Sequence, residues 1–171
     1  MKRKIAMLLA ALTLTVCAVS AQDAPRKVEN LPLIDMEKNP TLLPFFGEKN
    51  LMIFYVDPDA RTQNEEFTEE LEETHRADSP EIFGFGIINA KDTAIPNSLI
   101  RLFARKRTAK NKALVLLDDD RRLSTQWKLG DCNDKFVLLF VNKAGELVFM
   151  RKGELSKKDQ QEFLKVIDQH K

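Results

Sequence analysis

Residues 51–56 read LMIFYV, and the next three residues read DPD. A continuous apolar run of this length is typical of a strand that is buried on both faces of a sheet. Asp and Pro favour turns, so Asp57-Pro58-Asp59 ends the strand. Thr62 and Glu65 then have the spacing of a capping box, which predicts a helix that begins at Thr62. This stretch therefore predicts a central strand followed by a helix.

Strands and helices continue to alternate along the chain. Apolar runs at residues 82–88 and 113–117 predict two more strands. A helix is expected between them, with Asn97 or Ser98 as its cap and with Leu99, Leu102 and Phe103 as its apolar residues. Such alternation implies parallel strands that are joined by crossover helices.

The C-terminal part predicts antiparallel pairing and a last helix. Residues 136–141 are apolar, and NKAG at 142–145 has the composition of a hairpin turn before a strand at 146–150. Ser156 and Asp159 have capping-box spacing at the start of the last helix. The order of elements predicts the α/β class, as a thioredoxin-like three-layer α/β/α sandwich whose central mixed sheet ends in an antiparallel C-terminal hairpin.

The N-terminus has the pattern of a secretory signal peptide. A basic start, MKRK, precedes an apolar run from Ile5 to Val19, and Ala21 provides a small residue at the cleavage position. The run is short for a membrane-spanning helix, which needs roughly 20 apolar residues. An uncleaved anchor and a lipid on Cys17 are the alternatives. We expect a signal peptide at residues 1–21, a loose polar arm at 22–30 and one domain at 31–171, in a periplasmic protein with no stable membrane insertion after cleavage.

Charge and cysteine content narrow the function. Without the three basic residues of the signal peptide, 24 Lys and Arg face 26 Asp and Glu, so the mature chain is mildly acidic. A chain without a positive field is not expected to bind nucleic acid. After Cys17 is removed, Cys132 is the one cysteine left, so no disulfide can form within the chain. The domain must then be held together by burial of its core.

Three stretches resemble the small exported YtfJ-like family of thioredoxin-fold proteins. They read FFGEKNLMIFYVDPDARTQNEEFTEEL, GIINAKDTAIPNSLIRLF and DKFVLLFVNKAGELVFMRKGELS. The resemblance covers most of residues 30–170. It implies a thioredoxin fold and an exported protein, but no particular reaction, because the function of this family is poorly defined.

The sequence departs from the redox members of the thioredoxin-like class in two places. Their Cys-x-x-Cys lies at the start of the helix after the central strand, where the helix N-terminus lowers the thiol pKa. Residues 56–62 here read VDPDART and contain no cysteine. Their cis-proline precedes the fourth strand, and the matching positions here are Lys135 or Phe136, which rarely adopt the cis form. We therefore do not expect dithiol exchange.

The expected fold also predicts where a site would lie. In an open sheet, sites lie beyond the carboxyl ends of the parallel strands. Three loops should meet there, at residues 57–62, 89–97 and 130–135. The candidate binding residues in these loops are Asp57, Asp59, Asn89, Lys91, Asp92, Pro96, Asn97, Asp131 and Asp134.

Structural roles compete with these functional ones. Asp57 and Asp59 suit a turn and a helix cap, or a Ca²⁺ site completed by Asp131 or Asp134. Residues 92–98 form either part of a site or a rigid turn in which Pro96 prepares the next helix. Cys132 lies beside the cis-proline position, where a single thiol could form a mixed disulfide. The carboxylates on either side of Cys132, however, raise the pKa of a thiol.

Two charged clusters have the same ambiguity. One would either dock an acidic partner or an anionic lipid surface, or be a solvated helix end. It is basic and consists of Arg101, Arg105, Lys106, Arg107, Lys110 and Lys112. The other, Asp118-Asp119-Asp120, is expected to be a solvated turn rather than a cation site.

These observations favour a non-redox binding module with a periplasmic protein partner, and with neither a cofactor nor a bound metal. The sequence leaves the oligomeric state open. One alternative is a thiol oxidoreductase that uses Cys132 as its catalytic residue. The other is a Ca²⁺-binding structural module that is built on Asp57 and Asp59.

Overall fold

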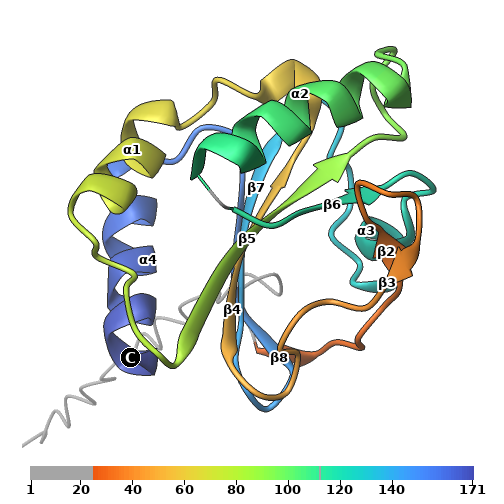
Figure 1. The fold of residues 1–171 in the computed structure, drawn as a ribbon. Coiled ribbons are helices and arrows are strands. Elements are labelled where there is room, and N and C mark those ends of the chain that lie inside the picture. Colours follow the sequence, from red (N-terminus) through yellow and green to blue (C-terminus); the bar gives the residue numbers. More distant parts are fainter. Residues whose placement is uncertain (1–24, 112) are drawn as a thin grey trace, which may run out of the picture.

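The computed structural model describes residues 25–111 and 113–171 (Figure 1). The expected signal peptide, residues 1–21, lies outside the described residues. Within the described part, we find no helix with the length and apolar character that a membrane span requires.

Eight strands of the described chain form one mixed sheet, in the order β1-β8-β7-β4-β5-β6-β2-β3. Its central strand β4 (Asn50–Val56) pairs in parallel with β5 (Ile82–Asn89) and antiparallel with β7 (Phe136–Val141). The other strands are β1 (Arg26–Lys27), β2 (Leu33–Ile34), β3 (Pro40–Thr41), β6 (Val115–Asp118) and β8 (Glu146–Lys152). Because β6 is parallel to β5, the carboxyl ends of β4, β5 and β6 share one edge of the sheet.

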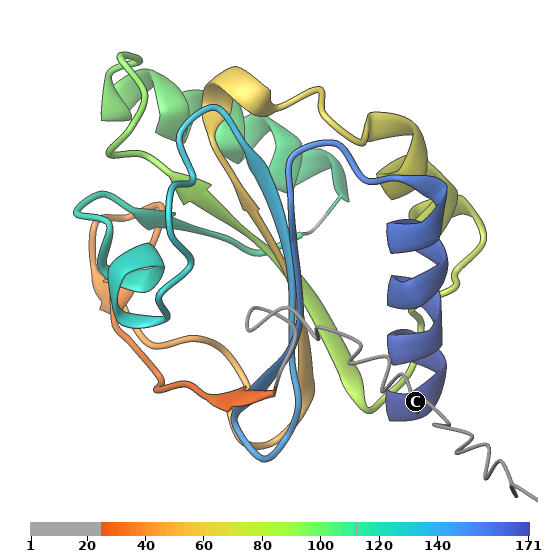
Figure 2. The same cartoon turned by 180° about the vertical axis from the view of Figure 1, so that it is seen from behind.

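Three helices cover one face of this sheet: α1 (Glu65–Glu73), α2 (Asn97–Asn111) and α4 (Lys157–His170). Figure 1 shows α1 beside α4, and their apolar side chains form one core cluster with Met52 of β4. Neighbouring β4 residues point to the other face, where Tyr55 packs with Trp127. That face is covered by the short helix α3 (Arg122–Gln126) and the N-terminal segment (Figure 2).

Most of the predicted elements are confirmed. The predicted strand at residues 136–141 has the bounds of β7, and the predicted strand at 82–88 is β5. The hairpin at 142–145 joins β7 to β8, where Gly145 donates to the carbonyl of Asn142 at 2.9 Å. Ser156 and Asp159 form the predicted capping box at the start of α4.

The predicted start of α1 is wrong. Asp57 instead accepts the N–H of Asp59 and caps a short 3-10 helix, η1 (Pro58–Ala60), which delays the α-helix to Glu65. Asn64 precedes α1 with φ of 61°, and its side chain does not cap the helix. Its amide instead donates to the carbonyl of Gly153 at 2.9 Å and accepts the N–H of Leu155 at 2.8 Å.

The expectation of a loose arm is wrong for its second half. Arg26 and Lys27 form β1 and pair antiparallel with β8. Arg26 donates to the carbonyl of Trp127 at 3.1 Å, and the Trp127 indole donates to the carbonyl of Glu29 at 2.9 Å. The arm is therefore fixed by contacts that lie about 100 residues away in sequence.

The apolar side of α2 also differs from the prediction. Ile100 and Ala104 are buried against Leu117 of β6, whereas Leu99 and Leu102 are exposed. The helix begins at Asn97 itself, and the carbonyl of Pro96 accepts the N–H groups of Leu99 and Ile100. Neither Asn97 nor Ser98 is therefore the residue that precedes the helix.

Candidate functional site

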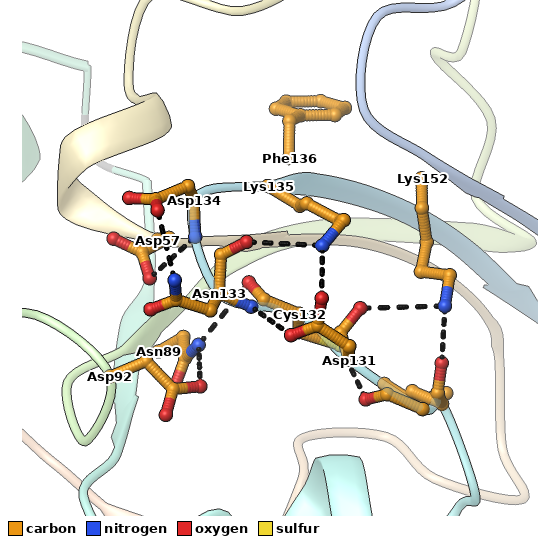
Figure 3. Close-up of polar contacts among 12 residues, drawn as sticks. Asp57, Asn89, Asp92, Asp131, Cys132, Asn133, Asp134, Lys135, Phe136 and Lys152 are labelled. Atoms are coloured by element: carbon orange, nitrogen blue, oxygen red, sulfur yellow. Dashed lines mark hydrogen bonds and ion pairs between the residues drawn. The ribbon is translucent and has the colours of Figure 1, made fainter.

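Asp57 joins the loop after β4 to the loop that enters β7 (Figure 3). One carboxylate oxygen of Asp57 accepts the N–H of Asp59 at 2.9 Å, and the other accepts the N–H of Asp134 at 3.2 Å. The N–H of Asp57 donates to the carbonyl of Lys135 at 3.1 Å. Gln63 adds two more bonds between the same loops, to the carbonyl of Asp134 and to the N–H of Phe136.

The loop after β5 joins the same cluster. The Asn89 amide donates to the Asp92 carboxylate at 2.7 Å and to the carbonyl of Cys132 at 3.4 Å. The Thr93 hydroxyl donates to the Asp59 carboxylate at 2.9 Å. The three predicted loops therefore meet at the carboxyl edge of the sheet, and we call these contacts the carboxyl-edge cluster: Asp57, Asp59, Asn89, Asp92, Thr93, Cys132 and Asp134.

Three fully buried polar residues lie side by side at the carboxyl ends of the parallel strands: Asn89 and Asp118 are the last residues of β5 and β6, and Asp57 follows β4. Asn89 pairs with Asp118, and Asp57 and Asn89 follow the paired residues Val56 and Ile88. Asp57, Asn89 and Asp118 are each 0% exposed. The Oδ1 atom of Asn89 has no hydrogen-bond partner among the described residues. Buried polar atoms are satisfied in most proteins, so the unpaired oxygen of Asn89 is unusual.

Burial changes the ionisation of these carboxyls. It raises the pKa of Asp57 and of Asp118, although backbone N–H groups that donate to each of them reduce the shift. Burial also opposes ionisation of Asp92, but hydrogen bonds from Arg121 and Asn89 and the charge of Arg121 together lower the pKa of Asp92. Arg121 forms an ion pair with Asp92.

Sequence reasoning missed Tyr55, Asp118 and Arg121. The Tyr55 hydroxyl donates to Asp118 at 3.1 Å, and Asp118 also accepts the N–H groups of Arg122 and Leu123 at the start of α3. The prediction of a solvated turn is therefore wrong for Asp118. One signal was present in the sequence: Asp118 directly follows the apolar run of β6, as Asp57 follows that of β4.

Cys132 is a buried thiol. It is 2% exposed, and its Sγ atom donates to the carbonyl of Gly130 at 3.4 Å. Burial raises the pKa of the thiol to about 11; Lys152 opposes the shift and Asp131 adds to it. A reactive cysteine is usually accessible and has a lowered pKa, and Cys132 has neither property.

Three carboxylates of the cluster could contribute to a cation site. Asp57, Asp59 and Asp134 each offer an oxygen atom, and these atoms all lie within 4.8 Å of one another. Asp131 is not among them, and its carboxylate pairs with Lys135 at 2.5 Å. Of the two completions considered from the sequence, the geometry thus favours Asp134.

Besides Asp131, three candidate residues lie apart from the carboxyl-edge cluster. In the described part of the chain, Lys91 and Asn97 make no side-chain hydrogen bond or ion pair with the cluster, and Pro96 contributes its carbonyl to the start of α2. Residues 92–98 are thus divided: Asp92 and Thr93 belong to the cluster, and Pro96 belongs to the helix start.

Neither device of dithiol exchange is present at this edge. The segment from Asp57 to Thr62 holds no cysteine, and the described residues contain no cis peptide bond, including the bonds at Lys135 and Phe136.

The chain has a thioredoxin-like fold. A DsbF homologue from Corynebacterium diphtheriae superimposes with a TM-score of 0.61 at 14% identity, over 85% of this chain and 87% of that one. The exposed lipoprotein thioredoxin Etrx1 from Streptococcus pneumoniae gives a TM-score of 0.55 at 13% identity, over 81% and 99%. The thioredoxin domain of a thiol-disulfide oxidoreductase from Bacteroides vulgatus gives 0.54 at 14% identity, over 82% and 94%.

Sequence comparison adds no family to this fold. No family model matches the chain, and no curated protein matches it. At identities of 14% or less, the thioredoxin-like proteins above share the fold with this chain and not necessarily the reaction. The resemblance to the YtfJ-like family stays a prediction from the sequence.

Proposed function

We propose that this chain is an exported thioredoxin-like binding protein, of the YtfJ type, that recognises a protein partner at the carboxyl-edge cluster without exchanging disulfides. The observation that carries the proposal is the Asp57 carboxylate, which is bonded to the N–H groups of Asp59 and Asp134. Asp57 and Asp59 lie directly after the central strand, where redox proteins of this fold carry their dithiol. Export is supported by the N-terminal pattern of residues 1–21.

The contacts of the cluster indicate how a partner would be recognised. The backbone carbonyls of Asn133, Asp134 and Lys135 already accept hydrogen bonds from within the chain. A partner would therefore meet side chains rather than a free strand edge. Asp59, Asn133 and Asp134 are exposed there, so the partner presents Lys, Arg or amide donors.

Crosslinking in living cells tests this proposal. A photo-crosslinking residue at Asn133 should capture a defined protein, and the same residue at Lys165 on α4 should not. Asp59→Asn combined with Asp134→Asn should weaken that capture by about tenfold, since two charge-assisted contacts are lost. Capture that survives this double substitution and the replacement of residues 91–97 would contradict the proposal. Reduction of insulin disulfides by the purified chain would contradict its non-redox part.

A second candidate function is cation binding. The spacing of the Asp57, Asp59 and Asp134 oxygens supports it, because Ca²⁺ is held by several carboxylate oxygens. Each carboxylate oxygen of Asp57 already accepts a backbone N–H group. A cation bound to Asp57 would therefore have to use an oxygen that is also hydrogen-bonded. Millimolar Ca²⁺ should raise the melting temperature of the wild type and not that of Asp134→Asn. An unchanged melting temperature of the wild type would exclude this function.

We do not favour the alternative in which Cys132 acts as a single catalytic thiol. The sulfur atom is buried, and its raised pKa keeps it protonated at neutral pH. A thiol that reacted readily in the folded protein would restore this alternative.

A further inference from the structure

Positive charge is concentrated on α2. Residues 93–117 contain no Asp or Glu, and they include the whole basic cluster: Arg101, Arg105, Lys106, Arg107, Lys110 and Lys112. Without these six, residues 22–171 contain 18 Lys and Arg against 26 Asp and Glu. Five of these six cations lie within α2 (Asn97–Asn111), in a chain that is otherwise acidic.

The same helix exposes apolar side chains. Leu99 is 45% exposed and Leu102 is 49% exposed. They are three residues apart, so they lie on the same side of α2. The opposite side holds the helix to the domain, because Ile100 and Ala104 are buried in the core. Arg105 adds a hydrogen bond to the carbonyl of Met36 at 2.9 Å and an ion pair with Glu37. Figure 1 shows α2 along an outer border of the molecule.

We propose that α2 docks on the surface of an anionic lipid bilayer, with Leu99 and Leu102 entering the headgroup region. A helix with cations, exposed leucines and no acidic residue has the composition of an interfacial membrane-binding helix. Each Lys or Arg near an anionic bilayer adds to the attraction. Anionic headgroups diffuse to match any spacing of cations, whereas an acidic protein would need carboxylates at matched positions.

Docking of this kind is peripheral, and it is independent of the carboxyl-edge cluster. It requires no membrane-spanning helix. The proposed partner of the cluster and the lipid would use different residues, so one of the two proposals can fail while the other holds.

Vesicle cosedimentation of the full chain tests the lipid proposal. The probes are vesicles of phosphatidylcholine alone and vesicles that also contain phosphatidylglycerol. Lys106→Glu with Lys110→Glu replaces two positive charges on α2 with two negative ones. Lys158→Glu with Lys165→Glu makes the same change in charge on α4. Residues 1–21 are common to all variants, so differences between variants report on the helices. Circular dichroism confirms that each variant is folded.

The wild type should bind the anionic vesicles more strongly, and added salt should weaken the binding. The α2 pair should reduce the partition coefficient by about tenfold or more, and the α4 pair by much less. Leu99→Ser with Leu102→Ser should also weaken binding, because the two apolar side chains that enter the headgroup region of the bilayer are replaced by polar ones.

Three results would overturn the lipid proposal. The first is equal binding of the wild type to both kinds of vesicle. The second is an equal loss in the α2 and α4 pairs. The third is binding of soluble polyglutamate through Lys106 and Lys110 without vesicle binding, which would identify an acidic protein as the partner of α2.

Discussion

The carboxylate of Asp57 accepts a hydrogen bond of 3.2 Å from the backbone N–H of Asp134, which lies 77 residues further along the chain. Asp57 is fully buried, and its second oxygen accepts the N–H of Asp59 at 2.9 Å. One side chain thus ties the end of β4 to the loop that enters β7. The geometry of the proposed binding surface depends on this contact.

Removal of the Asp57 side chain should therefore be costly. Asp57→Ala leaves the N–H groups of Asp59 and Asp134 without an acceptor, and we expect a loss of about 2–4 kcal/mol in the free energy of unfolding. Urea denaturation measures this loss. Asp59→Ala is the matched control, because Asp59 is exposed and should lose only about 0–1 kcal/mol. Similar losses in both variants would contradict the role of Asp57.

Asn64 is expected to stabilise the protein in two ways: its residue type tolerates a positive φ, and its side chain bonds the start of α1 to the β8–α4 connection. Its φ of 61° suits Asn or Gly, and its amide bonds to Gly153 and Leu155. Asn64→Gly should cost about 1–3 kcal/mol through the lost hydrogen bonds alone. Asn64→Ala should cost about 1 kcal/mol more, because Ala is strained at this φ. Thermal or urea unfolding measures the stability of the two variants. If Asn64→Ala were as stable as Asn64→Gly, the proposed strain at this positive φ would be contradicted.

Cys132 should react slowly in the folded protein. With the thiol 2% exposed and its pKa raised to about 11, little thiolate is present at pH 8. We expect 5,5′-dithiobis(2-nitrobenzoate) to modify it about 100-fold more slowly in the native state than in urea, since unfolding restores an ordinary pKa near 8.5. Fast native modification that follows an apparent pKa below 8.5 would contradict the buried, protonated thiol.

The contribution of Asp118 to the stability of the folded protein should decrease as the pH rises. Burial raises its pKa in the folded state, so the folded state binds this proton more tightly than the unfolded state does. The resulting stabilisation is full below the unfolded pKa of about 3.9, and it is lost as the pH rises through the folded pKa. The stability of the wild type relative to Asp118→Asn should therefore fall over that range. The neighbouring Asp119→Asn provides the control, and a difference that is constant with pH would refute the assignment.

Local patterns were enough to predict much of the fold. The apolar runs of β4, β5 and β7 are long and continuous, and runs of this kind are typical of buried strands. The capping box of α4 was also predictable, because its two partners lie three residues apart. At Thr62 the same pattern failed, because Asp57 stabilises a 3-10 turn and the Asn64 side chain bonds to the β8–α4 connection.

The candidate site was predictable in its place but not in its chemistry. Parallel strands bring their carboxyl ends together, which was sufficient to expect that the three loops meet. Tyr55, Asp118 and Arg121 were missed because their roles depend on partners in other elements: Tyr55 bonds across the sheet to Asp118, and Arg121 pairs with Asp92 of the loop after β5.

The sequence by itself determined that the redox motif is missing, since residues 56–62, where the redox members of this fold carry Cys-x-x-Cys, contain no cysteine. Covalent chemistry of this kind can be read from residue types alone. The tertiary structure decided that Asp57, Asn89 and Asp118 are buried side by side and that Leu99 and Leu102 are exposed. Burial is set by neighbours that are distant along the chain, so no local pattern of residues could have fixed it.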